Sequence, residues 1–295
     1  MFHKILIGSD GSVSSRNAAL LASEIARRFD SETIVVNAFD ISFTGAFEIG
    51  TCSLSASSDI IEKSMQSELA AAENAVKPLL APLQPPYRMI QELGHPADVL
   101  LAVAEREHAD LIVVGGRGLR QMKEFLLGSV SHCVLHHAHC PVLIERGQLR
   151  LFQRLLLACD GSAEARKAAD AAFALAKGFD ACVDVLNVEE PSGWFGREGH
   201  DPHPVKIPEE VQQRERRCPA VHASVEAAAK ETSVPFHICE ERGHAGEAIV
   251  RYAEKGRYDL IVMGRRGLGS FERLLVGSVS NYVASHACSP VLVVR

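Results

Sequence analysis

The stretch Asp259–Ser280, DLIVMGRRGLGSFERLLVGSVS, contains a short apolar run that leads into a series of glycines. Four apolar residues end at Gly264, which is typical of a buried parallel strand. Gly267 and Gly277-Ser278 follow with the spacing G-x2-G-x9-G-S, and a helix is expected over Ser278–His286. Glycines let a ligand approach the backbone, and a helix start offers free N–H groups to a phosphate. The stretch therefore predicts a strand, a glycine loop and a phosphate-binding helix start.

The same pattern occurs earlier in the chain, at 110–131, as DLIVVGGRGLRQMKEFLLGSVS. The two stretches are identical at 13 of 22 positions and lie 149 residues apart. Other landmarks recur at nearly the same offset: Asp10-Gly11-Ser12 with Asp160-Gly161-Ser162, Phe29-Asp30 with Phe179-Asp180, and Gly94-His95 with Gly243-His244. The period is far longer than a solenoid repeat. The sequence therefore predicts two tandem domains, a first copy at 1–146 and a second copy at 152–295, joined by a short linker.

Composition and charge limit the possible functions. The 295 residues are 47% apolar, which is ample for two cores, and the net charge is −6. Without a block of lysines and arginines, we expect no nucleic-acid partner. We see neither a signal peptide nor an apolar run long enough to span a membrane, and the eight cysteines are scattered. These features favour a cytosolic protein with reduced thiols and no membrane partner.

Short apolar runs alternate with helical segments in both copies. Expected strands are Lys4–Gly8, Thr33–Phe39, Tyr87–Leu93, Leu111–Val114, Val142–Glu145, Leu155–Ala158, Cys182–Val188, His237–Glu241, Leu260–Met263 and Val291–Val294. We expect one helix of the first copy to span Asp59–Lys77 and to stop at Pro78, and one of the second, Glu209–Lys230, to break near Pro219. Residues 40–58 and 189–208 are predicted loops. This alternation predicts an α/β fold with two five-stranded parallel sheets, each covered by helices on both faces.

Ligands of such sheets bind beyond the carboxyl ends of the strands, at a switch point in strand order. Asp10 and Asp160 follow the first strand of their copies and lie at that edge. The aspartates that precede the fourth strands, Asp110 and Asp259, lie at the opposite edge, so we do not expect them to be catalytic. Asp10 and Asp160 could also be turn or cap residues, because Asp-Gly is common in turns. Their coincidence with a glycine loop in both copies favours a ligand contact.

Two other nucleotide motifs do not match. The phosphate loop G-x-x-x-x-G-K-[ST] is absent. The pattern G-x-G-x-x-G begins at Gly267 and at Gly116, but Glu272 and Gln121 stand at the third glycine position. A dinucleotide site is therefore poorly supported.

The combination of Asp-Gly-Ser after the first strand, D-L-I-V-x-G-x-R-G and G-x2-G-x9-G-S resembles the universal stress protein family, twice over nearly the whole chain. The complete glycine motif is that of the ATP-binding subgroup. The resemblance implies a fold of adenine-nucleotide type, ATP with Mg²⁺ as cofactor, and a role in stress response. It also implies that the last strands, Val142–Glu145 and Val291–Val294, pair as an intramolecular pseudo-dimer, with a homodimer as a further possibility.

The resemblance also implies a set of site residues. Asp10 and the backbone of Ala38 would contact the nucleoside, and the glycines and serines would line the ribose and phosphates. The implied residues are Asp10, Ala38, Gly115, Gly118, Gly128, Ser129 and Ser131 in the first copy, and Asp160, Val188, Gly264, Gly267, Gly277, Ser278 and Ser280 in the second. Arg117 and Arg266, inside the loops, could equally meet phosphate or form an ion pair.

Function itself stays open between several classes. The chain could be an ATP-binding regulatory module, a slow ATP hydrolase, or a protein whose pockets bind a non-nucleotide, lipid-like ligand. The motifs supply no positioned base or Mg²⁺ carboxylate near a γ-phosphate, which favours binding without efficient catalysis. An ATP pyrophosphatase is disfavoured because the loop S-G-G-x-D-S is absent. A histidine- and cysteine-rich segment, 132–140, has helical spacing, but the second copy lacks most of these residues, so we expect helix-end chemistry and no metal site.

Overall fold

The computed structural model describes residues 1–40, 54–116, 127–146, 151–190, 208–267 and 276–295. They form two compact units, Met1–Leu149 and Arg150–Arg295. Most of the two predicted loops, together with Arg117 and Gly118, lies outside the described residues. Among the described helices, none has the length and apolar character needed to cross a membrane.

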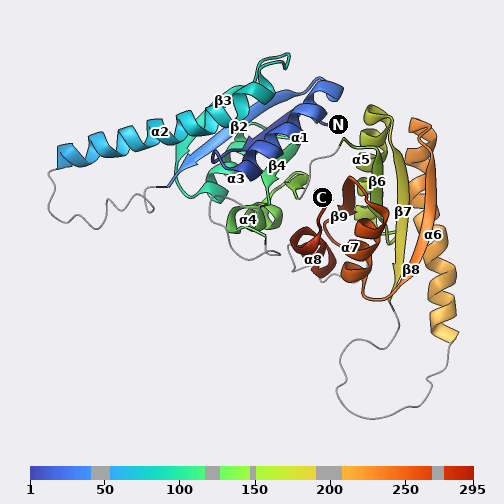
Figure 1. The fold of residues 1–295 in the computed structure, drawn as a ribbon. Helices are drawn as coiled ribbons and strands as arrows, with labels where there is room; N and C mark the ends of the chain where they lie inside the picture. Colours follow the sequence, from blue (N-terminus) through green and yellow to red (C-terminus); the bar gives the residue numbers. More distant parts are fainter. Residues whose placement is uncertain (41–53, 117–126, 147–150, 191–207, 268–275) are drawn as a thin grey trace, which may run out of the picture. The chain divides into compact units, whose positions relative to one another are not determined.

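Strands and helices alternate through the first unit, coloured blue to green in Figure 1. In chain order they are β1 (Lys4–Gly8), α1 (Val13–Phe29), β2 (Glu32–Phe39), α2 (Leu54–Leu80), β3 (Arg88–Leu93), α3 (Pro96–Arg106), β4 (Leu111–Gly115), α4 (Ser129–His137) and β5 (Val142–Glu145). The sheet order is β3-β2-β1-β4-β5 and the pairings are parallel. Helices α1 and α2 pack together on one face, and α3 and α4 pack together on the other.

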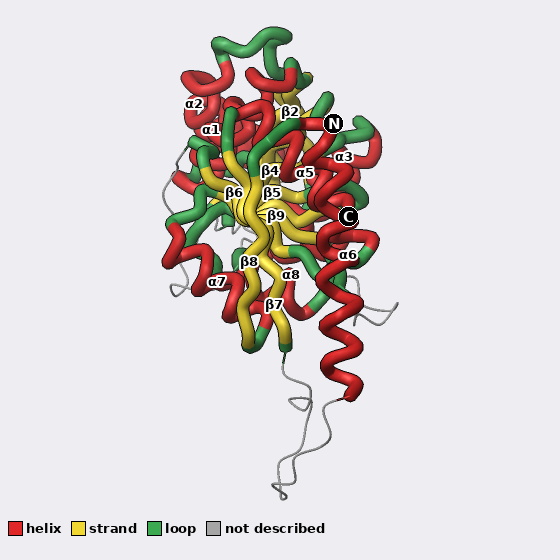
Figure 2. The backbone as a smooth tube through the Cα atoms, turned by 90° about the vertical axis from the view of Figure 1, so that its right-hand side faces the viewer, coloured by secondary structure: helices red, strands yellow, loops and turns green. Residues whose placement is uncertain are grey.

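The second unit repeats this architecture. Its elements are β6 (Arg154–Ala158), α5 (Ala163–Phe179), β7 (Cys182–Glu189), α6 (Pro208–Thr232), β8 (Phe236–Arg242), α7 (Ala245–Gly256), β9 (Leu260–Gly264), α8 (Ser278–His286) and β10 (Val291–Val294). The order β8-β7-β6-β9-β10 is again parallel, with strands and covering helices visible in Figure 2. The predicted fold class is therefore confirmed.

The central strands are buried on both faces. Ile5, Leu6 and Ile7 of β1 are fully buried, as are Leu155–Leu157 of β6. This explains why these strands are continuous apolar runs rather than alternating ones. The chain leaves β1 toward β2 on one side and reaches β4 on the other, so the switch point lies between β1 and β4, and in the second unit between β6 and β9.

The repeated Phe-Asp pair ends the first helix of each copy. Asp30 and Asp180 adopt left-handed backbone conformations, with φ of 52° and 53°, and cap α1 and α5. Aspartate tolerates this region better than most residues. The preceding Phe29 and Phe179 pack edge to face on Phe2 and Phe152. These landmarks are therefore structural and are not part of a site.

Two helices continue through prolines where the sequence predicts an end or a break. Helix α2 begins at Leu54 and continues through Pro78 to Leu80, and α6 runs unbroken through Pro219 to Thr232. Proline in a helix costs about 3 kcal/mol. Ala72, Val76 and Leu80 are fully buried at helical spacing on both sides of Pro78. Burial along this face offsets the cost of the proline, and sequence propensity alone could not show that.

Candidate functional site

The Asp-Gly-Ser turn joins the first strand of each copy to its helix. One carboxylate oxygen of Asp10 accepts a hydrogen bond from the backbone N–H of Ser12 at 3.0 Å, and Asp160 repeats this bond with Ser162 at 3.0 Å. The two serines are the N-caps of α1 and α5. The intervening glycines have φ of 77° and 80°, where most side chains would be strained. Each aspartate thus uses one carboxylate oxygen to shape the turn.

In the second copy the other carboxylate oxygen of Asp160 faces the glycine loop. A Cβ placed on Gly267 would lie 2.5 Å from Oδ2 of Asp160, so only glycine leaves room for this approach. A Cβ on Gly277 would lie 3.2 Å from the carbonyl oxygen of Arg265. Because Gly264 ends β9 and directly precedes this loop, the switch point brings Asp160, Gly264, Gly267 and Gly277 to one edge.

The described part of the first loop has the same backbone geometry. The N–H of Gly128 donates to the carbonyl of Gly116 at 2.9 Å, as Gly277 does to Arg265 at 2.9 Å. A Cβ on Gly115 would lie 2.6 Å from Oγ of Ser14, so α1 packs directly on the end of β4. Gly118 lies outside the described residues, which leaves its predicted contact with ribose and phosphate as a prediction.

Helices α4 and α8 begin at the end of these loops. Their N-caps, Gly128 and Gly277, supply no side-chain hydrogen bond, so the first N–H groups of each helix have no side-chain cap. Ser129 and Ser278 are exposed at the first helical position. These two helix starts can therefore offer N–H and hydroxyl donors to an anion.

Ser131 and Ser280 lie differently from the expectation that they hold phosphate. Both side chains are only 2% exposed. The hydroxyl of Ser280 donates to the carbonyls of Arg265, at 2.7 Å, and Gly277, at 3.0 Å, and Ser131 makes the matching contacts in the first copy. A hydroxyl has a single proton to donate, and here it is directed at the loop carbonyls. These serines therefore stabilise the backbone of the loop.

The strand ends that carry Ala38 and Val188 are half-buried at the same edge, with a buried asparagine just before each. In the first copy Asn37 donates to the carbonyl of Ser9 at 2.9 Å and accepts from Gln91 at 2.9 Å. Gln91 also donates to the carbonyl of Met65 in α2, which ties that helix to the sheet. We had not singled out Asn37, although one polar residue in the apolar run TIVVNAF was a usable signal.

Arg266 was expected to form either a phosphate contact or an ion pair. Its Nε donates to Oε1 of Glu164 at 3.0 Å, and its backbone N–H donates to the other oxygen of the same carboxylate. The structure therefore shows the ion pair. Glu164, in the first turn of α5, was missed because nothing in its local sequence connects it to a loop 102 residues away. Arg117, the matching residue of the first copy, lies outside the described residues.

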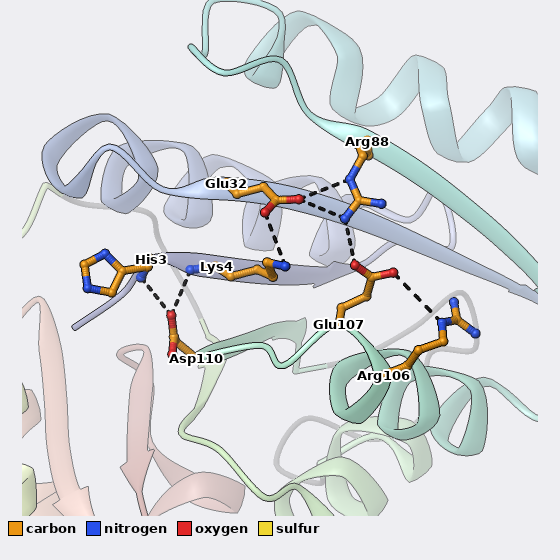
Figure 3. A network of polar contacts seen from close by, with 7 residues as sticks. All are labelled: His3, Lys4, Glu32, Arg88, Arg106, Glu107 and Asp110. Carbon is orange, nitrogen blue, oxygen red and sulfur yellow. Dashed lines mark hydrogen bonds and ion pairs between the residues drawn. The ribbon is translucent and has the colours of Figure 1, made fainter.

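Asp110 and Asp259 lie at the opposite, amino edge, as predicted. Oδ2 of Asp110 accepts from the backbone N–H groups of His3 and Lys4, both at 2.9 Å (Figure 3). Asp259 binds two backbone N–H groups in the same way, both at 3.0 Å. These carboxylates fix the start of the first strand of each copy and stand away from the glycine loops.

The histidine-rich segment provides helix-end contacts. Nδ1 of His137 lies 2.9 Å from the carbonyl of Cys133, and Nδ1 of His286 lies 2.8 Å from that of Tyr282 at the end of α8. The rings of His132 and His136 stack at 4.3 Å. Within the described residues, no group of three metal-ligating side chains converges.

Cys159 directly precedes Asp160 but is a poor nucleophile. It is 3% exposed, and burial raises the pKa of its thiol to about 11. The reactive thiolate is therefore scarce at neutral pH. Cys159 is therefore a small buried apolar group of the core.

The comparisons with known proteins agree with this geometry. The model of the universal stress protein family matches residues 1–146 and 151–295. A universal stress protein of Methanocaldococcus jannaschii is 34% identical over 147 residues, covering 50% of this chain and 83% of that protein. One from Mycolicibacterium smegmatis is 33% identical over 200 residues, covering 63% of this chain and 62% of that protein. The crystal structure of one from Archaeoglobus fulgidus has the same fold, with a TM-score of 0.70 at 22% identity over 100% of this chain and 99% of that one. The chain therefore belongs to the universal stress protein family, with one family domain in each copy.

Proposed function

We propose that this chain is a cytoplasmic stress-response regulator that binds ATP at the glycine loop of each copy. One observation carries the proposal: in the second copy a carboxylate, a glycine loop and a helix start without a side-chain cap meet at one sheet edge. The 2.5 Å approach of a Gly267 Cβ to Asp160 makes this a cradle that side chains would fill. Carboxylates commonly bind ribose hydroxyls, and helix starts bind phosphates.

In this proposal Asp160 and the end of β7 at Val188 contact the nucleoside. The first N–H groups of α8, with the exposed hydroxyl of Ser278, hold the phosphates. Asp10, Ala38 and Ser129 take the same roles in the first copy. Mg²⁺, when bound, supplies charge neutralisation to the phosphates, which are its preferred ligands.

Binding without efficient catalysis is favoured over hydrolysis. Among the described residues of the second copy, Asp160 and Glu164 are two carboxylates beside the loop. In this structure Asp160 is held by the turn and Glu164 is paired with Arg266, so neither is oriented in advance as a general base. Multiple-turnover phosphate release, compared between wild type and Ser278→Ala, checks this point. A release rate that is substantial and falls in the variant would favour the hydrolase.

The test of nucleotide binding is calorimetric titration of the full chain with ATP and Mg²⁺. We expect a stoichiometry near two that falls toward one in Gly277→Val and in Gly128→Val, because a β-branched side chain blocks the approach of a ligand to the backbone. Each altered site should lose about 1.5–3 kcal/mol of binding free energy, the range for hydrogen bonds to charged groups. Wild type that binds no ATP, or two variants that bind like wild type, would reject the nucleotide proposal. Mass spectrometry of co-purified ligand then identifies a lipid-like alternative.

We also propose that β5 and β10 pair as a pseudo-dimer within the chain. Both end the sheet order of their own unit, and an uncovered apolar strand edge is an aggregation hazard. A cysteine pair at Leu143 and Leu292 should then form an intramolecular crosslink with a short reagent. A pair that crosslinks no faster than one at exposed control positions would contradict the pairing.

A further inference from the structure

The carboxylate of Glu164 binds the second glycine loop of the same chain. Its carboxylate binds the backbone N–H of Arg266 and, at 3.0 Å, the Nε of the same residue. The side chain of Glu164 is 18% exposed and that of Arg266 is 37% exposed, so the pair is partly shielded from solvent. A backbone N–H together with a guanidinium is the donor set that proteins use for phosphate oxygens. Glu164 therefore occupies two donors that a phosphate could otherwise bind.

The loop and the start of α5 are packed tightly enough to hold this contact. A Cβ on Gly264 would lie 3.0 Å from the carbonyl carbon of Glu164, so glycine allows the helix to approach the end of β9. On its other side, the Cα of Arg266 lies 3.5 Å from the Cβ position of Gly277, at the start of α8. Arg266 thus lies close both to Glu164 and to the proposed phosphate-binding helix start.

The first copy arranges the same place differently. Ser14 takes the position of Glu164 beside the loop, and its hydroxyl donates to Oε2 of Glu145 on β5 at 2.8 Å. Glu145 is opposite Gly115 in the strand register, where the second copy has Val294 opposite Gly264. In the first copy the carboxylate beside the loop therefore belongs to the last strand. In the second copy it belongs to the first turn of the helix, where it binds a loop arginine.

We propose that Glu164 competes with the phosphates of a nucleotide for the donors of Arg266 at the second site, and that nucleotide binds there by displacing Glu164 from Arg266. The inference rests on the proposed ATP binding and adds regulation to it. The first copy has Ser14 at this place, a side chain that carries no charge. Removal of Glu164 should strengthen binding at the second site, because the loop donors become available and a like charge is lost.

The experiment measures ATP affinity by calorimetry in the Gly128→Val full chain, so that the second site reports alone. Glu164→Ser installs the residue of the first copy, and we expect binding to tighten on the order of tenfold, the effect of one charge-assisted hydrogen bond. The matched control is Glu247→Ser, which removes the same charge from an exposed first-turn position of α7. Adenosine, which has no phosphate, should bind both variants and their parent equally.

Several outcomes separate this inference from the proposed function. If the parent binds ATP and Glu164→Ser binds no tighter, the competitor role is overturned while the nucleotide site stands. An equal gain for adenosine, or for Glu247→Ser, also overturns it. Absence of ATP binding in every variant and in wild type overturns both proposals. If Glu164→Ser melts below its parent, Glu164→Gln, which removes the charge and keeps the shape, must give the same tightening.

Discussion

Among the described residues, the amino edges of the two sheets differ in their ion pairs, whereas the carboxyl edges share the Asp-Gly-Ser turn. In the first copy Arg88 binds Glu32 at 2.8 Å and Glu107 at 2.7 Å, and Lys4 adds a contact to Glu32 at 3.3 Å (Figure 3). In the second copy cysteine and glycine, Cys182 and Gly256, stand where the first has these two glutamates. The ion network around Glu32 in the first copy is thus replaced by other partners in the second.

The second copy uses a buried tyrosine at this edge instead. The hydroxyl of Tyr258 donates to Asp184 at 2.6 Å, and Arg154 binds the same carboxylate at 3.1 Å. The Arg154 guanidinium also lies 4.7 Å from the centre of the Tyr258 ring, a cation–π distance. Burial, and then Asp184, raise the pKa of Tyr258, so its hydroxyl stays protonated and continues to donate.

Several side chains that bind backbone groups are retained in both copies. At the amino edge the shared residues are Asp110 and Asp259, each bound to two backbone N–H groups. At the carboxyl edge they include Asp10 and Asp160, each bound to a turn N–H. The amino-edge side chains that bind only other side chains differ between the two copies. Both copies also retain the glycine spacing that begins at the ends of β4 and β9.

The largest effect that tests this comparison is expected at Tyr258. Tyr258→Phe removes the donor to a carboxylate that is only 8% exposed, and should lower the free energy of unfolding by about 1–3 kcal/mol. Tyr87→Phe in the first copy is the matched control, because in the described part of the chain no hydrogen bond of the Tyr87 hydroxyl is found. Urea denaturation followed by circular dichroism measures both variants. Equal losses in the two would mean that the buried network adds no stability of its own.

The sequence predicted the parts of this molecule that depend on local pattern. Apolar runs ending in glycine became the central strands, and the switch point brought Asp160 to the second glycine loop as expected. The predicted helix end at Pro78 and the predicted break near Pro219 were wrong, because packing overrode a local preference. Those errors lie outside the site and leave its position unchanged.

Within the site, the failures come from side chains whose partners are distant in sequence. Ser280 was expected to face a phosphate, yet it donates to the carbonyls behind the loop. Glu164 gave no signal because its partner, Arg266, lies on another strand end. Backbone-lined features can be read from spacing, whereas the direction of one hydroxyl or carboxylate depends on tertiary packing.

The smallest effect is expected from the exposed network of the first copy. Arg88 is 49% exposed and Glu32 is 36% exposed, so Arg88→Gln should cost only about 0.2–1 kcal/mol of stability at neutral pH. Arg88 holds the pKa of Glu32 below its ordinary value of 4.5, partly opposed by burial. A lowered folded-state pKa contributes stability above the unfolded value and loses it as pH falls through the folded value.

The difference in unfolding free energy between wild type and Arg88→Gln should therefore shrink as the pH is lowered below 4.5. Added salt should reduce it as well, because about 1 M salt screens charges beyond about 3 Å. Denaturant titrations at several pH values, with and without salt, measure both trends. A difference that persists in acid and in high salt would show that the Arg88 stem stabilises this edge by packing. In that case packing would stabilise both amino edges, and the different charges of the two edges would not contribute to the difference in stability.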